Sequence, residues 1–376
     1  MKILNVKVGP PADDYSAWIR IIKIANLMTS LGHEMDFVIY TGLDDFNEEI
    51  KKQINFPYEV VKVSPLTIYS KHFKKIKEGN YDLVFCNGQL THAVLFLTKF
   101  KDVTFIMDKH GDVVKEFLLY ENGLKFNPSS IFKYLFFKTM DYLNLHFSDR
   151  INCVSHKMIE DLYSRGLKPN KAAYVTNGID LSLFKEPENS KIHEIKDILD
   201  INNQMVFTYL GACEKWQGID KFIEAAEELK DRDELAFVIV GGKKRKDDGN
   251  IRYIPKVPQS EVVYYYAISD VLVLPRPTHP AAEVAAPTKF PEYLAMGKPI
   301  LTTEVGDAAE FVRENQCGII VKNNDPECLI EGILELKNKD KDVIRKMGIN
   351  SKKLAKKEFS MEKMASDLSN AFQIEY

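Results

Sequence analysis

The 376-residue sequence lacks the features of a membrane-spanning, secreted or nucleic-acid-binding protein. No apolar run reaches the roughly 18 residues that a membrane-spanning helix requires. Asn5 and Lys7 interrupt the first residues, where a signal peptide would be continuously apolar. The 51 basic and 54 acidic residues give a net charge of −3, whereas nucleic-acid-binding proteins are usually strongly basic. We therefore expect a cytoplasmic protein with no nucleic-acid partner.

Cysteine is scarce and follows no metal-binding or redox pattern. The cysteines are odd in number, widely spaced and never part of a C-x-x-C pair. They lie mostly within apolar runs, which predicts reduced thiols in the core. The histidines show no ligand spacing and are not arrayed with the cysteines, so no metal site is predicted. The five cysteines are Cys86, Cys153, Cys213, Cys317 and Cys328.

What is present indicates a globular protein with more than one domain. The chain has 45% hydrophobic and 28% charged residues, and its length exceeds the ~150 residues of one typical domain. Strand-like and helical segments alternate along both halves, which predicts parallel sheets. We expect strands at residues 2–8, 34–40, 59–63, 82–86, 103–107, 150–154 and 172–175, and then at 205–210, 235–240, 251–254, 271–274, 299–302 and 318–321.

The first helix, predicted over residues 17–31, indicates how helices cover these sheets. Trp18, Ile21 and Ala25 share one face, and Arg20 and Lys23 lie opposite. We expect the apolar face to pack on a sheet.

The alternating pattern is interrupted once, which indicates a boundary between two domains. Residues 181–203 are polar and lack a strand pattern, so they predict a linker with a short helix near residues 192–199. We expect an N-terminal domain over residues 1–180, completed by a C-terminal helix at 358–376, and a C-terminal domain over 204–357. Both are predicted to be doubly wound α/β domains of the Rossmann type, facing a central cleft.

The densest set of candidate binding residues lies at 286–300, between two predicted strands. Thr288 can cap a short helix, so that the amides of Lys289 and Phe290 point into the cleft. Such amides bind anions, and the Lys289 side chain adds positive charge. The Glu292 carboxylate would repel a phosphate unless it points away from it and accepts hydrogen bonds from hydroxyl groups, such as those of a ribose. The alternative is a Glu that only complements the helix dipole.

Two further turns follow predicted strands. Gly211 opens a βα turn that offers backbone donors and carries one cation, Lys215. An ordinary turn is the alternative, because the G-x-G-x-x-G and P-loop motifs are absent. In the first half, His110 follows the strand at 103–107, between charged residues and a glycine. A single histidine is usually structural, but its position at a strand end makes His110 a candidate for the active site.

Residues 131–147 form a helical pattern with two interpretations. Phe132 and Phe136 accompany Lys133 and Lys138, which would suit contact with a membrane or an amphiphilic acceptor. The apolar residues wrap most of the circumference, however, and this favours a buried helix. Peripheral membrane contact is therefore allowed by the sequence but not favoured.

The order of these motifs resembles the family-4 retaining glycosyltransferases of the GT-B fold over nearly the whole chain. The last matching segment is similar to a recurring subgroup of that family. In chain order the matching segments are Ser16-Ala-Trp-Ile-Arg20, Gly32-His-Glu34, Val154-Ser-His-Lys-Met158, Val175-Thr-Asn-Gly-Ile-Asp180, Trp216-Gln-Gly-Ile-Asp220, and Pro287-Thr-Lys through Glu292-Tyr-Leu-Ala-Met-Gly-Lys-Pro299.

The resemblance implies transfer of a sugar from a nucleoside diphosphate sugar, with retention at the anomeric carbon and without a metal or other cofactor. By position, Glu292 would bind the ribose, the turn at residues 288–290 would hold the diphosphate, and His110 would contact the donor sugar near the reacting carbon. The acceptor, a glycan, a lipid-linked glycan or a small molecule, would lie against the loop from Gly9 to Asp13.

Two departures from the family pattern concern the residues that would bind the diphosphate. The family has an Arg and a Lys where this chain has Ala212 and Gln217. Both usual cations are therefore missing, and Lys215 and Lys289 would replace them.

A third departure affects catalysis. The family has a Glu eight positions before Glu292, where this chain has Val284. The neighbouring Glu283 would serve in its place if the loop is one residue longer.

Two other functions fit the same residues. The missing cations would permit a non-catalytic glycosyltransferase-like subunit that binds a nucleotide sugar or a partner, and the same fold also includes nucleotide-sugar epimerases. A subunit that only binds should release no nucleoside diphosphate with any acceptor. An epimerase should convert its donor with no acceptor present.

Overall fold

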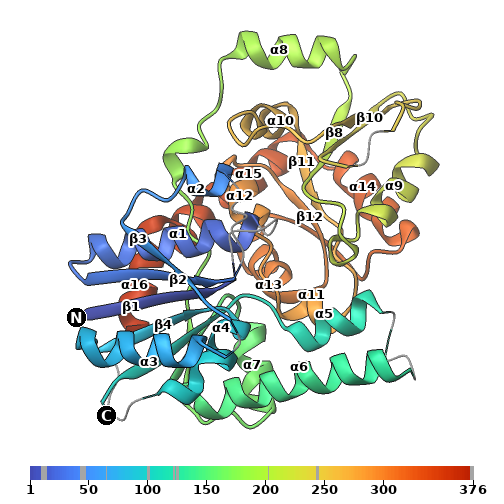
Figure 1. Ribbon diagram of the computed structural model, residues 1–376. Helices are drawn as coiled ribbons and strands as arrows, with labels where there is room; N and C mark the ends of the chain where they lie inside the picture. Colours follow the sequence, from blue (N-terminus) through green and yellow to red (C-terminus); the bar gives the residue numbers. More distant parts are fainter. Residues whose placement is uncertain are drawn as a thin grey trace. The chain divides into compact units, whose positions relative to one another are not determined.

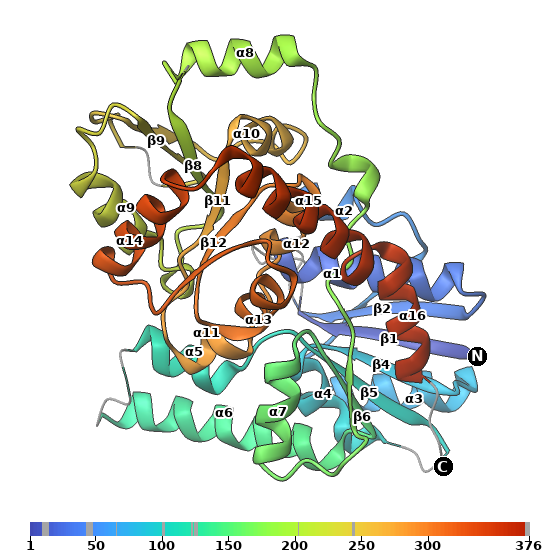
Figure 2. The same cartoon turned by 180° about the vertical axis from the view of Figure 1, so that it is seen from behind.

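The computed structural model describes residues 1–9, 15–42, 48–64, 66–99, 102–121, 123, 127–201, 203–242 and 245–372. The chain forms two compact units (Figures 1 and 2). The first unit contains Met1–Thr176 and the residues from Ala365 onward, and the second contains Asn177–Met364. Helix α16 (Met361–Phe372) therefore begins in the second unit and ends in the first.

The first unit is built on a parallel sheet of seven strands in the order β3-β2-β1-β4-β5-β6-β7. All seven strands predicted for this half are confirmed, with ends shifted by a few residues at most. The chain winds outward from β1 on one side and from β4 on the other, so the winding direction switches between these neighbours. The strands are β1 (Lys2–Val8), β2 (Glu34–Thr41), β3 (Tyr58–Lys62), β4 (Leu83–Asn87), β5 (Thr104–Lys109), β6 (Arg150–Cys153) and β7 (Ala172–Tyr174).

Helices cover both faces of this sheet. On one face, Trp18 and Ile21 pack against Phe37 of β2, as the apolar face of the first helix predicts. On the other, Ile76 and Leu95 join a core with β1 and β4. The helices of this unit, besides α16, are α1 (Tyr15–Ser30), α2 (Glu48–Lys51), α3 (Ile68–Gly79), α4 (Gln89–Leu95), α5 (Val113–Tyr120), α6 (Pro128–Phe147) and α7 (His156–Ser164).

Helix α6, the long green helix in Figure 1, packs against α4 and α5 but leaves an apolar face exposed. Its inward face includes polar groups: Asp141 pairs with Arg165 at 2.6 Å, and Asn144 bonds His92 at 2.9 Å. The favoured interpretation of a buried helix is therefore wrong for much of α6, because these polar residues found partners inside the unit. The exposed apolar residues are Ile131, Phe132, Leu135, Phe136, Tyr142 and Phe147.

The second unit repeats the architecture with a parallel sheet of six strands in the order β10-β9-β8-β11-β12-β13. All six predicted strands are confirmed here as well. The winding direction switches between β8 and β11. The strands are β8 (Met205–Leu210), β9 (Leu235–Val240), β10 (Ile251–Ile254), β11 (Val271–Leu274), β12 (Ile300–Thr303) and β13 (Gly318–Val321).

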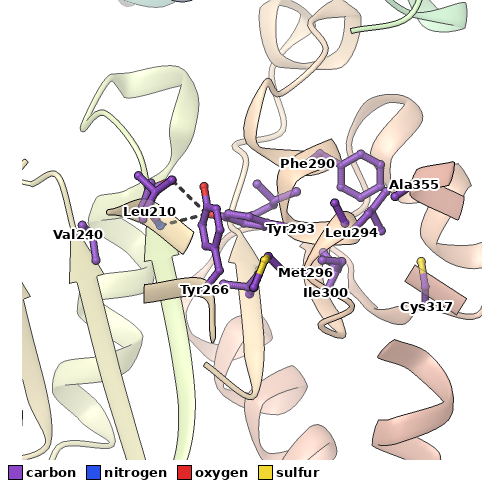
Figure 3. Packing of buried hydrophobic residues seen from close by; sticks show 14 of the residues in the cluster. Leu210, Val240, Tyr266, Phe290, Tyr293, Leu294, Met296, Ile300, Cys317 and Ala355 are labelled. Carbon is purple, nitrogen blue, oxygen red and sulfur yellow. Dashed lines mark hydrogen bonds between the residues drawn. The ribbon is translucent and has the colours of Figure 1, made fainter. Parts of the chain in front are cut away.

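Two apolar clusters flank the second sheet. One joins Phe222 and Leu329 to the strands, and the other joins Tyr266 and Tyr293 to the opposite face. The Tyr293 hydroxyl donates to the Leu210 carbonyl and accepts from the Leu210 amide, both at 3.0 Å, which ties α12 to the end of β8 (Figure 3). The helices are α8 (Asn189–Ile198), α9 (Ile219–Glu228), α10 (Val262–Ile268), α11 (Pro280–Val284), α12 (Lys289–Ala295), α13 (Gly306–Asn315), α14 (Pro326–Lys337) and α15 (Lys341–Glu358).

The structure tests the expectations about buried cysteines and membrane-spanning helices. Cys86, Cys153 and Cys317 are buried, but Cys213 is exposed, so the prediction of a core thiol is wrong there. Cys213 belongs to the turn after β8 rather than to an apolar element. In the described parts of the chain, no helix combines the length and apolarity needed to cross a membrane.

Candidate functional site

In doubly wound folds, ligands bind at the carboxyl ends of the strands where the winding direction switches. In the first unit this position lies at the ends of β1 and β4, with β5 beside β4. Gly9 follows β1, Gly88 follows β4, and His110 follows β5. Gly88 has a φ of +90°, and a Cβ atom there would lie 3.6 Å from His110 Cε1. A glycine at this position therefore avoids strain and leaves room beside the imidazole.

His110 is adjacent to a buried ion pair. Its side chain is 27% exposed, and its Nδ1 lies 3.7 Å from Oδ2 of Asp108, beyond hydrogen-bond distance. Asp108 is fully buried and accepts two hydrogen bonds of 2.9 Å from Arg20. Burial by itself would raise the pKa of Asp108, but Arg20 and His110 outweigh it and lower the pKa to about 2. Asp108 is thus negatively charged at neutral pH.

Arg20 is buried, although the sequence pattern placed it opposite the apolar face of the first helix. It lies on α1 opposite the apolar stripe, yet its side chain is 5% exposed. Besides Asp108, its guanidinium donates to the carbonyls of Thr176 at 3.1 Å and Val175 at 3.2 Å. A buried guanidinium is tolerated where most of its donors are satisfied.

Gly9 occupies the end of β1. It has a φ of +102°, which favours glycine, and a Cβ atom there would meet nothing within 4 Å. Its amide donates to the Tyr40 carbonyl at 2.9 Å. The rest of the predicted acceptor loop, residues 10–13, lies outside the described residues.

In the second unit the corresponding position lies at the ends of β8 and β11. Gly211 follows β8, and a Cβ atom there would lie 2.9 Å from the Tyr209 hydroxyl, so a larger residue would displace this tyrosine. That hydroxyl donates to the Ala212 carbonyl at 2.6 Å and holds the turn. Lys215, the predicted cation of this turn, has an exposed side chain in a short 3-10 helix.

The turn before α12 differs from the predicted anion site. Thr288 makes no side-chain cap hydrogen bond, so the predicted cap is wrong. The Phe290 amide donates to the Pro287 carbonyl at 3.2 Å, and the Phe290 side chain is buried in the core. The Phe290 amide is therefore already engaged, because the chain closes a tight turn before α12.

Glu292 lies on α12 and is almost buried, with 9% of the residue exposed. Its Oε2 accepts a 2.6 Å hydrogen bond from the Tyr266 hydroxyl and lies 3.1 Å from Lys289 Nζ. Lys289, predicted to face a phosphate, is thus paired with Glu292 in this structure. Burial and, secondly, Glu292 raise the pKa of Tyr266 well above its usual range, so Tyr266 stays a hydrogen-bond donor.

Glu283 lies on α11. Its Oε2 accepts a 3.1 Å hydrogen bond from the Gly306 amide, which begins α13. In this structure the carboxylate therefore caps a helix, a stabilising position for a negative charge.

Sequence reasoning missed Arg276 as a site residue. Arg276 comes two residues after β11 and is 1% exposed. Its Nη2 donates to the Ala282 carbonyl at 3.1 Å, and its guanidinium carbon lies 5.0 Å from the centre of the Trp216 ring. Its Nε and Nη1 atoms are buried without a hydrogen-bond partner. The sequence signal was a cation immediately after a strand and a proline.

The described residues contain no group of three or more His, Cys, Asp or Glu side chains placed to hold a metal ion. The described polar groups at the two switch points include amides, hydroxyls, carboxylates, the His110 imidazole and the guanidinium groups of Arg20 and Arg276. Such groups suit a polar organic ligand that carries hydroxyls and negative charge.

Two protein-family models match the chain in succession. Residues 18–183 match "Glycosyltransferase Family 4", and residues 191–354 match "Glycosyl transferases group 1". An uncharacterized glycosyltransferase of Methanocaldococcus jannaschii is 27% identical over 237 residues, which cover 60% of each chain. A D-inositol 3-phosphate glycosyltransferase of Corynebacterium efficiens is 24% identical over 223 residues, 54% of this chain and 51% of that one. The matches thus span only about half to three fifths of these relatives.

Solved structures with a similar fold match along almost the whole chain. The Anabaena protein HepE in complex with UDP has a TM-score of 0.78 at 16% identity, covering 98% of this chain and 99% of that chain. Sucrose-phosphate synthase from Thermosynechococcus elongatus has a TM-score of 0.71 at 16% identity, covering 99% and 98%. The two parallel-sheet α/β units have the GT-B architecture, as predicted. Each of the two family models matches a little under half of the chain, so the chain is similar to these glycosyltransferase families along most of its length.

Proposed function

We propose that this protein transfers a sugar from a nucleoside diphosphate sugar to an acceptor, with retention at the anomeric carbon and without a bound metal. The observation that carries the proposal is the switch point of the second unit, where Gly211 follows β8, the Arg276 guanidinium follows β11, and the Glu292 carboxylate lies in the first turn of α12. The two glycosyltransferase family models support the same reaction class.

Glu292 is proposed to bind the donor ribose. A carboxylate can accept about four hydrogen bonds. The Tyr266 hydroxyl and Lys289 Nζ both donate to Oε2 of Glu292. Oε1 has only a longer contact of 3.4 Å with Lys289. It therefore keeps capacity for a ribose hydroxyl while Tyr266 and Lys289 fix the carboxylate.

His110 is proposed to act on the donor sugar. The charged Asp108 carboxylate near Nδ1 favours a proton on that nitrogen, which leaves Nε2 as an acceptor for a sugar hydroxyl. Such a contact orients the sugar while the diphosphate departs and positive charge develops at the anomeric carbon. Glu283 stays a candidate for a catalytic role if donor binding releases it from the Gly306 amide.

The proposal is tested by incubating the protein with nucleotide sugars and a panel of acceptors, and by measuring release of nucleoside diphosphate. UDP-glucose is the first donor to try, since HepE, of similar fold, was solved with UDP-glucose. Acceptor-dependent release of UDP supports transfer. Donor conversion without an acceptor would instead indicate an epimerase, and saturable binding without any release would indicate a binding subunit.

Replacing Glu292 with Gln is expected to weaken UDP binding about ten- to a hundredfold, because a hydrogen bond to a charged group contributes roughly 1.5–3 kcal/mol. The fold should persist, since a glutamine carbonyl oxygen can still accept from Tyr266. Isothermal titration calorimetry measures the change. Glu228→Gln, on an exposed position of α9, is the control and should bind as the parent does. Equal affinities for the parent and Glu292→Gln would reduce Glu292 to a structural role.

We further propose that α6 brings the protein to an anionic membrane surface, as an enzyme with a lipid-linked acceptor would require. Phe132 and Phe136 are 72% and 50% exposed, and they lie on one face of the helix. Lys133 and Lys138 are also exposed and border that face. The one acidic residue of α6, Asp141, is buried against Arg165. Exposed rings bordered by lysines match an anionic bilayer.

Flotation with vesicles measures this contact. The parent protein should float with vesicles of phosphatidylglycerol and phosphatidylcholine at low salt, and not with phosphatidylcholine alone. Changing Phe132 and Phe136 to Ser, or Lys133 and Lys138 to Glu, should leave most of the protein at the bottom. Leu183→Ser, an exposed position of the second unit, is the control. A parent protein that stays at the bottom with both lipids would contradict the proposal.

A further inference from the structure

Arg276 is a buried cation whose hydrogen-bonding capacity is largely unused. Burial, the main cause, lowers its pKa to about 10, so the guanidinium is still charged at neutral pH. Of its donor nitrogens, Nη2 bonds the Ala282 carbonyl, whereas Nε and Nη1 have no partner. A buried charge with unsatisfied donors is costly, and proteins keep such groups mostly where a ligand completes them.

The described side chains around Arg276 offer no hydrogen-bond acceptor to its Nε and Nη1 atoms. It forms no ion pair with any residue that the structure describes. Glu283 is near enough to favour the charged form, but its Oε2 is engaged by the Gly306 amide. The Tyr209 hydroxyl donates to Ala212 instead. The remaining contact is the Trp216 ring, 5.0 Å away, which attracts a cation but accepts no conventional hydrogen bond.

The position of Arg276 indicates what would complete it. It follows β11, beside the turn after β8, and these two strands form the switch point of the second sheet. That turn includes Ala212. In the glycosyltransferase family that the sequence resembles, a diphosphate-binding cation stands at this position. Lys289 is paired with Glu292, and Lys215 is exposed. Among the described residues at this switch point, Arg276 is therefore a buried cation whose Nε and Nη1 atoms have no hydrogen-bond partner.

We propose that Arg276 binds the diphosphate of the donor and replaces the cations absent at Ala212 and Gln217. This rests on the proposed function of the second unit. A guanidinium suits the task because its planar fork can donate two parallel hydrogen bonds to phosphate oxygens. The Trp216 ring lies 5.0 Å from the guanidinium carbon, so a diphosphate that binds Arg276 would change the surroundings of the ring. The indole is then a fluorescent reporter, and Trp18, the other tryptophan, is buried in the first unit.

The experiment compares the parent with Arg276→Met and Arg276→Lys, using UDP and uridine as ligands. Both variants should bind UDP about ten- to a hundredfold more weakly while uridine affinity stays unchanged, because only the phosphates contact Arg276. UDP should also change the fluorescence of the parent, and Trp216→Phe should abolish that change. Lys215→Ala is the matched cation control and should lose less UDP affinity than either Arg276 variant.

Thermal unfolding without ligand separates binding from support of the fold. Arg276→Met should unfold at or above the parent temperature, because it removes an unpaired buried charge. A lower unfolding temperature for both variants, with UDP and uridine weakened equally, would overturn the proposal. So would unchanged UDP affinity in either variant. If methionine alone disrupts packing, weaker UDP binding by a folded Arg276→Lys supports the proposal.

Inorganic pyrophosphate distinguishes this proposal from the proposed function. If the parent binds pyrophosphate through Arg276 but binds no nucleoside diphosphate, the anion site stands and the proposed donor does not. If the parent binds UDP and Arg276→Lys binds it equally well, only the assignment of Arg276 falls. If the parent binds neither, both fall.

Discussion

Replacing His110 with alanine is expected to lower the rate of sugar transfer by about a hundredfold, a loss of ~3 kcal/mol in transition-state stabilisation. Affinity for UDP should stay nearly unchanged. The reason is that all proposed nucleotide contacts lie in the second unit, whereas His110 belongs to the first. The imidazole is therefore assigned to the sugar, where its contact matters most as the leaving group departs.

Transfer rates at saturating donor, together with calorimetry of UDP binding, measure the two quantities separately. His193→Ala is the control, since His193 is exposed on α8. The His110→Ala protein should unfold at the parent temperature, because His110 Nδ1 forms no hydrogen bond that the change would break. Transfer at the parent rate by the folded variant would show that the reaction centre lies elsewhere.

Replacing Arg20 with methionine should destabilise the first unit by about 3–5 kcal/mol, the typical cost of leaving a buried charge without its partner. Asp108 would keep its buried carboxylate but lose both hydrogen bonds from Arg20. Urea unfolding followed by Trp18 fluorescence, in a Trp216→Phe background, reports on this unit. Arg313→Met breaks an exposed pair with Glu304 and should cost at most about 1 kcal/mol. Similar costs for the two changes would contradict the role of Arg20.

The same ion pair predicts a dependence of stability on pH. The pKa of Asp108 is lowered to about 2 in the folded protein, from an ordinary value of 3.8. A depressed folded pKa means that the stabilisation is present above pH about 4 and is lost as the pH falls toward about 2. In Arg20→Met this part of the acid dependence should shrink, since the pKa of Asp108 rises. Unfolding curves between pH 2 and pH 5 for both proteins measure the difference.

The strands could be predicted from the sequence because their signal is local. Each of the predicted strands is a short run rich in apolar residues, bounded by turn residues, and both sheets are parallel because helices alternate with them. The positions of His110 and Gly211 at strand ends follow from the same pattern. Neighbouring residues suffice for these inferences, and no long-range contact is needed.

The polar contacts could not be predicted, because their partners are distant in the chain. Arg20 looks like a solvent-facing residue of α1 until Asp108, 88 positions away, is brought beside it. The direction of α6 depends likewise on His92 and Arg165, which turn its polar residues inward and leave its aromatic rings outside. Composition gives no indication of this inversion.

The sequence by itself determined two doubly wound α/β units and the strand ends where a ligand would bind. Only the tertiary structure decided which charged side chains are buried at those strand ends. Arg276 is buried and two of its nitrogens have no hydrogen-bond partner, whereas Lys289 forms an ion pair with Glu292. The physical reason is that burial and pairing of a charge depend on every element packed around it, whereas the strand pattern depends on neighbouring residues alone.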